Sequence, residues 1–332
     1  MAEVVAVRVP HHLAEDTEAL SALRELVHDW ATPREGFVTI HALEETAGGA
    51  VLVMEPDPPC ELRDVALAAR AVLSPEGRVR WAAARAREAA RALGALPGPM
   101  RDLSPRTLGF AADGRLRLLP PLARVTASHG RMGAGVVPRG LAWLSPELTR
   151  GTHVDRRSDV FQLATLTWTL CGVAPPFARG TDLDTLTAIL EGPRPPPLSE
   201  AAGVPSTLDD AVARGLARDP AERHEDAAAF ALALAHVPDA SADEQAEVAA
   251  DALRRARART RSAAGASDFA SRLFDGPVAR PCLKRWDDLA ATARPAIRDC
   301  AECGLSVERV KTLGALVPLA GSCVFYDPEP EG

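Results

Sequence analysis

The hydrophobic pattern near the start of the chain predicts a small unit of three strands and one helix. Residues 3–9, 36–43 and 50–55 are runs of β-branched and apolar side chains, and the third run follows a Gly-Gly turn signal. Within residues 20–30, apolar side chains recur at i, i+3, i+7 and i+10, which places them on one face of a helix. We therefore expect the order strand, helix, strand, strand, followed by a Pro-rich connector at residues 55–59.

The pattern becomes mainly helical after this connector. An Ala/Arg stretch at residues 78–96 predicts a long helix that ends at a Pro-Gly-Pro breaker, and an Asp-Gly turn joins two short strands within residues 107–119. A capping box, Ser241 with Glu244, begins a further helix. The remaining helix candidates are separated by Pro and Gly and span residues 157–171, 181–191, 207–217 and 225–236.

Composition excludes several classes of protein. Of the 332 residues, 47% are hydrophobic and 25% are charged, which is the balance of a globular chain and not of a disordered one. The net charge of −7 repels polyanions, so we expect no dedicated nucleic-acid binding. The longest uncharged run, residues 160–178, contains Thr, Gln and a Pro pair, so we expect a buried helix and no membrane span. The first residues of the chain lack the pattern of a secretory signal, so we expect a cytoplasmic protein. In that reducing compartment we expect the Cys residues to be thiols or metal ligands.

Four motifs in the second half of the chain follow one another in a fixed order. Ser145-Pro146-Glu147 is followed by V-D-R-R-S-D-V-F-Q-L at 154–163, by G-V-A-P-P-F at 172–177 and by L-A-R-D-P-A-E-R at 216–223. Residues 144–235 thereby resemble the C-terminal lobe of bacterial Ser/Thr protein kinases of the eukaryotic type, which has A-P-E, a long buried helix and L-x-x-D-P-x-x-R at these places. Several spaced matches are far more specific than one short motif.

The resemblance extends towards the start of the chain. Residues 101–105, R-D-L-S-P, look like the catalytic loop H-R-D-L-K-P-x-x-N, residues 51–55 look like the last N-lobe strand and hinge, and residues 5–8, V-A-V-R, look like V-A-I-K. The resemblance implies an α+β, protein-kinase-like fold with a truncated N-lobe and a helical C-lobe. We expect four parts: a truncated N-lobe at 1–55, a C-lobe at 56–238, a helix and linker at 239–281 and a small four-Cys module at 282–332.

By the same resemblance, the residues that hold magnesium-bound nucleotide are replaced. Arg8 stands at the position of the phosphate-pairing Lys, and the chain has Lys only at Lys284 and Lys311. Arginine keeps the charge but not the shape of Lys, so the exchange is not conservative at a fitted site. Thr107 replaces the metal-binding Asn, and Pro120 falls at the Asp of D-F-G. Because phosphoryl transfer depends on positioning and charge neutralisation, we do not expect ATP and Mg²⁺ to bind.

Other positions of the family's site are kept or altered. Asp102 keeps the place of the catalytic base, whereas the His and Lys of that loop are replaced. We interpret Asp102 as a vestigial base that orders the loop, since a base without metal or nucleotide has nothing to act on. The first glycine is Gly36, which lies after the V-A-I-K-like strand, so we expect no Gly-rich phosphate loop. The helical partner of the Lys is ambiguous between Glu25 and Leu23, and Glu25 is better interpreted as a solvated residue.

The residues with structural roles in the family are retained. By resemblance, Arg101 belongs to the catalytic loop and Asp159 hydrogen-bonds the backbone of that loop. Glu147 and Arg223 form a buried ion pair that ties the segment before the long helix to the C-terminal helices. Retained supports combined with replaced site residues are typical of a pseudokinase.

Four of the six Cys residues lie near the end of the chain with the spacing C-x17-C-x2-C-x19-C: Cys282, Cys300, Cys303 and Cys323. The C-x2-C turn lets two thiolates share one ion, and the other two Cys would complete a tetrahedron around one structural Zn²⁺. A segment this small gains from such a staple. Free thiols in a small core and a redox pair at Cys300 and Cys303 remain the alternatives. The segment also resembles a small Cys-containing module found in some bacterial kinase-like and signalling proteins.

The sequence therefore predicts a catalytically inactive, cytoplasmic, protein-kinase-like signalling or scaffold protein that binds other proteins. The first alternative is an atypical Ser/Thr protein kinase with residual ATP binding and slow transfer through Asp102. The second alternative is a metal or redox sensor that acts through the Cys module. Binding of Mg-ATP distinguishes the first two, and an effect of reversible thiol oxidation on partner binding favours the third.

Overall fold

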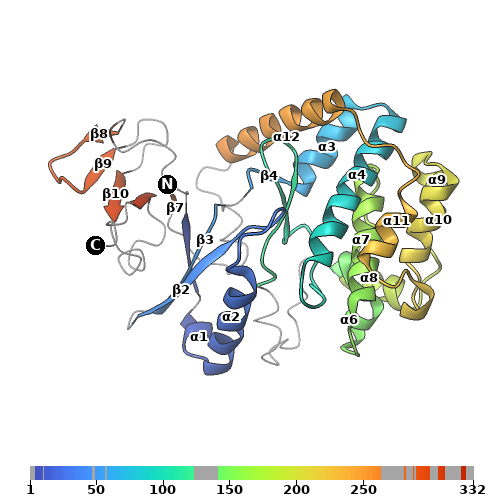
Figure 1. The fold of residues 1–332 in the computed structure, drawn as a ribbon, viewed down its shortest axis with the longest axis horizontal. Coiled ribbons are helices and arrows are strands. Elements are labelled where there is room, and N and C mark those ends of the chain that lie inside the picture. Colours follow the sequence, from blue (N-terminus) through green and yellow to red (C-terminus); the bar gives the residue numbers. More distant parts are fainter. Residues whose placement is uncertain are drawn as a thin grey trace.

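The chain has an α+β fold with a sheet-bearing N-terminal lobe, a larger helical lobe and a small C-terminal sheet (Figure 1). The computed structural model describes residues 4–9, 11–46, 49–56, 58–122, 141–262, 280–281, 287, 289–299, 306–310 and 323–326. Across these residues, every helix is too short or too polar to cross a membrane.

The N-terminal lobe has the predicted order of strand, helix, strand and strand, with a short additional helix, α1, before the predicted one. Its elements are β1 (Val5–Arg8), α1 (His11–Ala14), α2 (Thr17–Trp30), β2 (Ile40–Thr46) and β3 (Gly49–Met54). The strands pair antiparallel in the order β1-β3-β2, and α2 packs against β2. Val7, Leu52 and Met54 belong to the same hydrophobic core as the buried side chains of α2.

The second predicted strand, residues 36–43, begins later than the sequence pattern indicates. Strand β2 starts only at Ile40, because Phe37 forms a bridge with Leu118 in the other lobe. The N–H of Val38 donates to the carbonyl oxygen of Leu118 at 2.8 Å. The apolar residues before β2 therefore connect the two lobes and do not extend the N-terminal sheet.

The C-terminal lobe is built from helices around α4 and α7. Its elements are α3 (Leu62–Val72), α4 (Pro75–Gly94), the 3-10 turn η1 (Leu141–Trp143), α6 (Pro146–Arg150), α7 (Arg156–Leu170), α8 (Asp182–Leu190), α9 (Leu198–Ala202), α10 (Ser206–Gly215), the 3-10 turn η2 (Pro220–Glu222) and α11 (Ala227–Ala233). Helix α7 is buried on nearly all sides, so its polar side chains need partners inside the protein. Thr165 and Thr167 donate to the carbonyl oxygens four residues earlier at 3.0 and 2.8 Å. The long buried helix that the sequence predicted is confirmed.

A short sheet lies where the two lobes meet. Its strands are β4 (Cys60–Glu61), β5 (Leu108–Phe110) and β6 (Leu116–Leu118), which pair antiparallel in that order. The predicted hairpin turn joins β5 to β6, and Gly114 takes the positive φ of +79° that this turn requires. Arg117 on β6 donates to the carboxylate of Glu55, which directly follows β3, at 2.6 Å. This ion pair ties the connector between the lobes to the hairpin.

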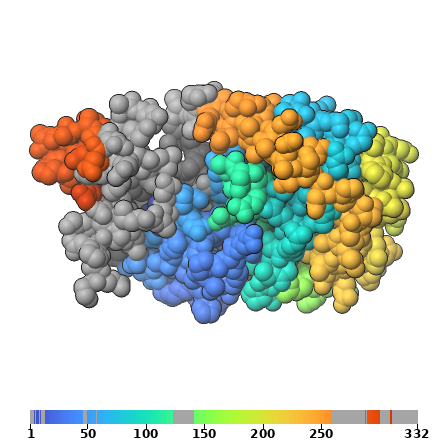
Figure 2. Space-filling view, turned by 45° about the horizontal axis from the view of Figure 1, so that its top comes forward, coloured from blue at the N-terminus to red at the C-terminus, as the bar shows by residue number. Residues whose placement is uncertain are grey.

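Helix α12 (Ala242–Ser262) lies along the surface of the helical lobe beside α3 (Figures 1 and 2). Val248, Ala252 and Ala256 on its inner face belong to the hydrophobic core of the lobe, and Glu244 near its start pairs with Arg80 of α4. The segment that we assigned as helix and linker thus packs against the kinase-like lobe as far as this helix extends.

The last described elements form a separate five-stranded sheet. Its strands are β7 (Arg280–Pro281), β8 (Ala290–Ala291), β9 (Ile297–Asp299), β10 (Ser306–Val310) and β11 (Cys323–Tyr326). They pair in the order β7-β11-β10-β9-β8, so β7 forms one edge of this sheet.

Candidate functional site

Asp159, in the first turn of α7, holds the segment that resembles a catalytic loop. Its two carboxylate oxygens accept from the N–H groups of Met100 and Arg101, each at 2.8 Å. Arg101 has a φ of +64°, the one positive φ of a non-glycine residue in the described chain. Such a backbone conformation is unfavourable by about 1–3 kcal/mol and persists only where the surroundings enforce it. The two bonds from Asp159 are the contact with the loop backbone that the resemblance implies, and they help to hold Arg101 in this conformation.

Thr107 and Ser104 use their hydroxyl groups within the same loop. Thr107 Oγ1 donates to the carbonyl oxygen of Asp102 at 2.5 Å and accepts from the N–H of Ser104 at 3.1 Å. Ser104 Oγ accepts from the N–H of Arg106 at 3.3 Å. The side chains of Thr107 and Ser104 are both buried. The hydroxyl at the position of the metal-binding Asn thus closes the loop on itself.

Pro120 lies next to Thr107, at the position of the D-F-G aspartate. The N–H of Leu119 donates to the carbonyl oxygen of Thr107 at 2.9 Å, and Pro120 itself is buried. A proline side chain has no atom that can bind a metal, whereas Mg²⁺ requires oxygen ligands in a nearly octahedral arrangement. Within the part of the chain that the structure describes, no group of three or more His, Cys, Asp or Glu side chains could hold a metal ion. The side chains of Thr107 and Pro120 thus offer no carboxylate or amide oxygen to a metal ion at these two positions.

Two polar residues of α7 support the site although the sequence analysis did not single them out. Gln162 Oε1 accepts from the N–H of Leu103 at 3.0 Å, which adds a third backbone group of the loop to the two that Asp159 holds. Ser158 Oγ donates to a carboxylate oxygen of Glu147 at 2.5 Å. A signal was available, because Ser158, Asp159 and Gln162 are polar residues within a helix that the sequence predicts to be buried.

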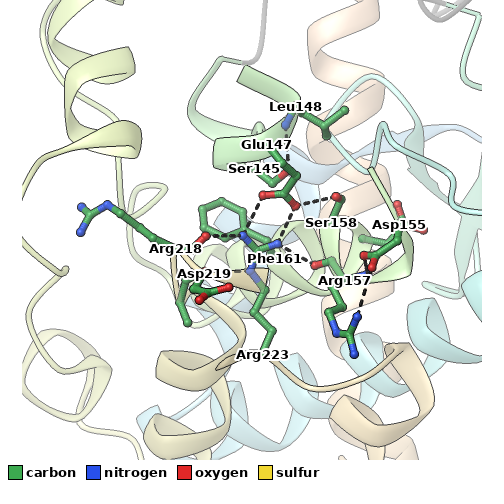
Figure 3. Close-up of polar contacts among 12 residues, drawn as sticks. Ser145, Glu147, Leu148, Asp155, Arg157, Ser158, Phe161, Arg218, Asp219 and Arg223 are labelled. Carbon is green, nitrogen blue, oxygen red and sulfur yellow. Dashed lines mark hydrogen bonds and ion pairs between the residues drawn. The ribbon is translucent and has the colours of Figure 1, made fainter. Parts of the chain in front are cut away.

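Glu147 and Arg223 form a bidentate ion pair inside the C-terminal lobe (Figure 3). The two N···O distances are 2.6 and 2.9 Å, and the side chains of Arg223 and Glu147 are only 0% and 6% exposed. The remaining N–H groups of the guanidinium donate to the carbonyl oxygens of Ala217, Arg157 and Arg218 at 2.7, 2.9 and 3.1 Å. All five donors of Arg223 therefore have acceptors, and the pair joins α6, α7 and the segment around η2.

The surroundings of Glu147 favour its charged form. Burial raises the pKa of this carboxyl group, but the hydrogen bonds and charge of Arg223, with a further bond from Ser158, outweigh burial and hold the pKa below its usual value. The ring of Phe161 lies 5.0 Å from the guanidinium carbon of Arg223, which adds a cation–π contact. The pair is thus a structural unit with every charge compensated.

The remaining predicted site residues are placed as follows. Arg8 ends β1, with its side chain outside the described part, and Asp102 is half-buried in the loop. Glu25 is exposed on α2, in agreement with a solvated residue. Three of the predicted metal ligands, Cys282, Cys300 and Cys303, lie outside the described residues. The fourth, Cys323, begins β11, and its side chain is not described. Cys60 and Cys171, in contrast, are both buried.

Comparison with known proteins relates the chain to bacterial protein kinases. It is 33% identical over 135 residues to the tyrosine-protein kinase MasK of Myxococcus xanthus, a match that covers 40% of this chain and 21% of MasK. It is 33% identical over 135 residues to the serine/threonine-protein kinase PknL of Mycobacterium tuberculosis, covering 40% and 34% of the two chains. With the serine/threonine-protein kinase PknH of Mycobacterium bovis it shares 30% identity over 161 residues, covering 48% and 26%. The chain thus spans about a fifth to a third of the length of these relatives.

The solved structures show the same fold. The crystal structure of a mutant of the Mycobacterium tuberculosis PknI kinase domain superposes with a TM-score of 0.50 and 22% identity, covering 70% of this chain and 83% of that domain. No family model matches the chain. By its fold and its sequence relatives, the chain is a protein-kinase-like protein related to the bacterial Ser/Thr and Tyr protein kinases.

Proposed function

We propose that this chain is a pseudokinase: a protein-kinase-like protein that does not transfer phosphate and that acts by binding other proteins. One observation carries the proposal. The two positions at which the family holds Mg²⁺ are occupied by Thr107, whose hydroxyl is engaged by the loop backbone, and by the buried Pro120. Phosphoryl transfer needs the metal to neutralise charge on the moving phosphoryl group, so replacement of both ligands argues against catalysis.

The supports of the site favour a binding role over an unfolded remnant. Asp159 and Gln162 still hold three backbone N–H groups of the loop, and the buried pair of Glu147 and Arg223 still joins the helices. A lobe whose loop and helices are held in place by these internal contacts suits recognition of a protein partner, since little loop entropy is lost on binding. The free, buried thiol of Cys171 suits a reducing compartment, and we place the protein in the cytoplasm.

Two assays test the absence of catalysis. Mg-ATP at millimolar concentration should leave the melting temperature of the chain unchanged, because a ligand stabilises a protein only when it binds the folded state. The chain should also transfer no label from [γ-³²P]ATP to a general kinase substrate. Transfer that Asp102→Asn abolishes, and that the matched change Asp113→Asn in the exposed hairpin turn leaves intact, would overturn the proposal in favour of an atypical kinase.

We also propose that Cys282, Cys300, Cys303 and Cys323 bind one structural Zn²⁺. Support comes from the chemistry of four thiolates with one C-x2-C pair in a segment that is small for an independent core. Elemental analysis of the purified chain should give about one zinc per molecule. Cys300→Ser should lower this ratio, whereas Cys171→Ser, in the helical lobe, should leave it unchanged. A ratio near zero in the unmodified chain contradicts the proposal.

A further inference from the structure

The face of the N-terminal sheet opposite α2 is apolar and covered. Ala6 lies opposite Val53, and Val51 lies two residues before Val53, so the three side chains share one face. They are only 4%, 2% and 2% exposed. None of the three belongs to the hydrophobic core that the described residues form on the α2 side. The core on the α2 side therefore does not account for the burial of this face.

Strand β1 forms an edge of the described N-terminal sheet. The N–H of Val9 donates to the carbonyl oxygen of Ala50 at 2.9 Å. Because hydrogen-bonded pairs alternate along antiparallel strands, Val5 and Val7 also direct their backbone groups towards β3. The N–H and C=O groups of Ala6 and Arg8 consequently point away from β3, towards the open edge.

Strand β7 of the C-terminal sheet lies against β1 (Figure 1). It is itself an edge strand, since its sheet runs in the order β7-β11-β10-β9-β8. Two sheet edges thus face each other across the contact. Proteins protect such edges by covering them, because an open edge invites pairing with other chains.

We infer that the C-terminal sheet is an intramolecular partner of the kinase-like lobe, which docks on the edge of β1 and on the apolar face formed by Ala6, Val51 and Val53. Arg8 lies two residues after Ala6 in the same strand, at a register position that belongs to the same face of the sheet. By resemblance, Arg8 holds the position of the phosphate-pairing Lys. The docked sheet therefore covers the side of the lobe at which active relatives meet nucleotide phosphates.

This docking connects the two parts of the chain functionally. A change in the C-terminal sheet, such as loss of a metal or oxidation of its thiols, would uncover an apolar face and a strand edge of the lobe. The inference rests on the resemblance at Arg8 and not on the absence of catalysis. Its tests measure docking alone, so its failure is distinguishable from failure of the proposed pseudokinase function.

Hydrogen exchange of the full chain provides the first test. Val53→Asp places a charge on the docking face and should speed exchange roughly tenfold or more in β10, in β11 and at the amides of Ala6 and Arg8. The matched control His41→Asp changes an exposed residue of the same sheet and should leave these rates unchanged. Exchange in α7 reports whether the helical lobe stays folded. Unchanged rates in β10 and β11 of Val53→Asp overturn the inference.

A cleavage experiment provides a test that does not depend on how Val53→Asp folds. A protease site is inserted within residues 263–279 of the full chain, which lie between α12 and β7, and the purified protein is cut there. The two fragments should co-elute in size-exclusion chromatography. Separation of the fragments of the otherwise unmodified chain contradicts docking.

Discussion

Replacement of Arg223 by Met tests whether the buried ion pair is a main support of the helical lobe. The variant removes the guanidinium but keeps a long apolar side chain beside Phe161. Glu147 would then remain buried with a charge and without its partner, although Ser158 still donates to it. Three backbone carbonyl oxygens would also lose the donors that Arg223 provides.

The expected loss is large because both side chains are inaccessible to water. Breaking a buried pair by removing one partner typically destabilises a protein by about 3–5 kcal/mol. For a unit of this size, 1 kcal/mol corresponds to roughly 2–4 °C in melting temperature, so we expect a decrease of roughly 6–20 °C. Adding Glu147→Gln to Arg223→Met removes the unpaired charge, and the double variant should be more stable than Arg223→Met alone.

The chain supplies a matched control. Arg24 and Glu45 form a bidentate pair of the same type at 2.9 and 2.8 Å, but their side chains are 56% and 38% exposed. Arg24→Met should therefore change stability by at most about 1 kcal/mol. Thermal unfolding followed by circular dichroism measures all four proteins. Equal decreases in melting temperature for Arg24→Met and Arg223→Met would refute the reasoning that burial determines how much an ion pair contributes to stability.

Three further predictions concern individual buried groups. Asp159→Ala should cost about 1–3 kcal/mol for each of the two backbone N–H groups it leaves without an acceptor, and hydrogen exchange at Met100 and Arg101 should accelerate while α12 stays protected. Burial lowers the pKa of His224, and the hydrogen bond of its ring to the carbonyl oxygen of Ala211 offsets this only in part. The unfolded state therefore binds the proton first, so the stability of the chain should fall as the pH drops below 6.5. His224→Gln should flatten this part of a plot of melting temperature against pH, and an unchanged slope counts against the assignment. Burial raises the pKa of Cys171 to about 12, so iodoacetamide should leave this thiol unmodified in the native chain at pH 8 and alkylate it in urea, as mass spectrometry of the peptides would show.

The sequence predicted the elements of the N-terminal lobe better than their faces. In α2 the pattern selected Leu20, Leu23, Val27 and Trp30, but the buried side chains are Ala19, Leu23, Leu26 and Trp30. The predicted buried face of the helix is therefore correct to within one position. The difference arises because Ala19, being small, carries little weight in a hydrophobic pattern although it is buried.

Contacts between distant segments were predictable only through the resemblance. The spacing of Glu147 and Arg223 along the chain says nothing about a bond between them, and the motif order was needed to expect one. Arg117 with Glu55 and Arg80 with Glu244 belong to no such motif, and both pairs join elements far apart in the chain. Local pattern cannot select among the many Arg and Glu residues of this sequence, because pairing depends on how the helices and sheets pack.

The distribution of kept and replaced residues at the site has a physical explanation that does not involve catalysis. Asp159 satisfies two N–H groups of a loop with a strained Arg101 backbone, so the fold needs it whether or not nucleotide binds. Thr107 can replace an Asn there because its hydroxyl closes the same loop. Pro120 is also compatible with the fold at its position, because its buried side chain has no polar atom that needs a hydrogen-bond partner. A chain selected only to fold would therefore keep Asp159 but would not need an Asn at Thr107 or an Asp at Pro120, the residues that the resemblance to active kinases implies there.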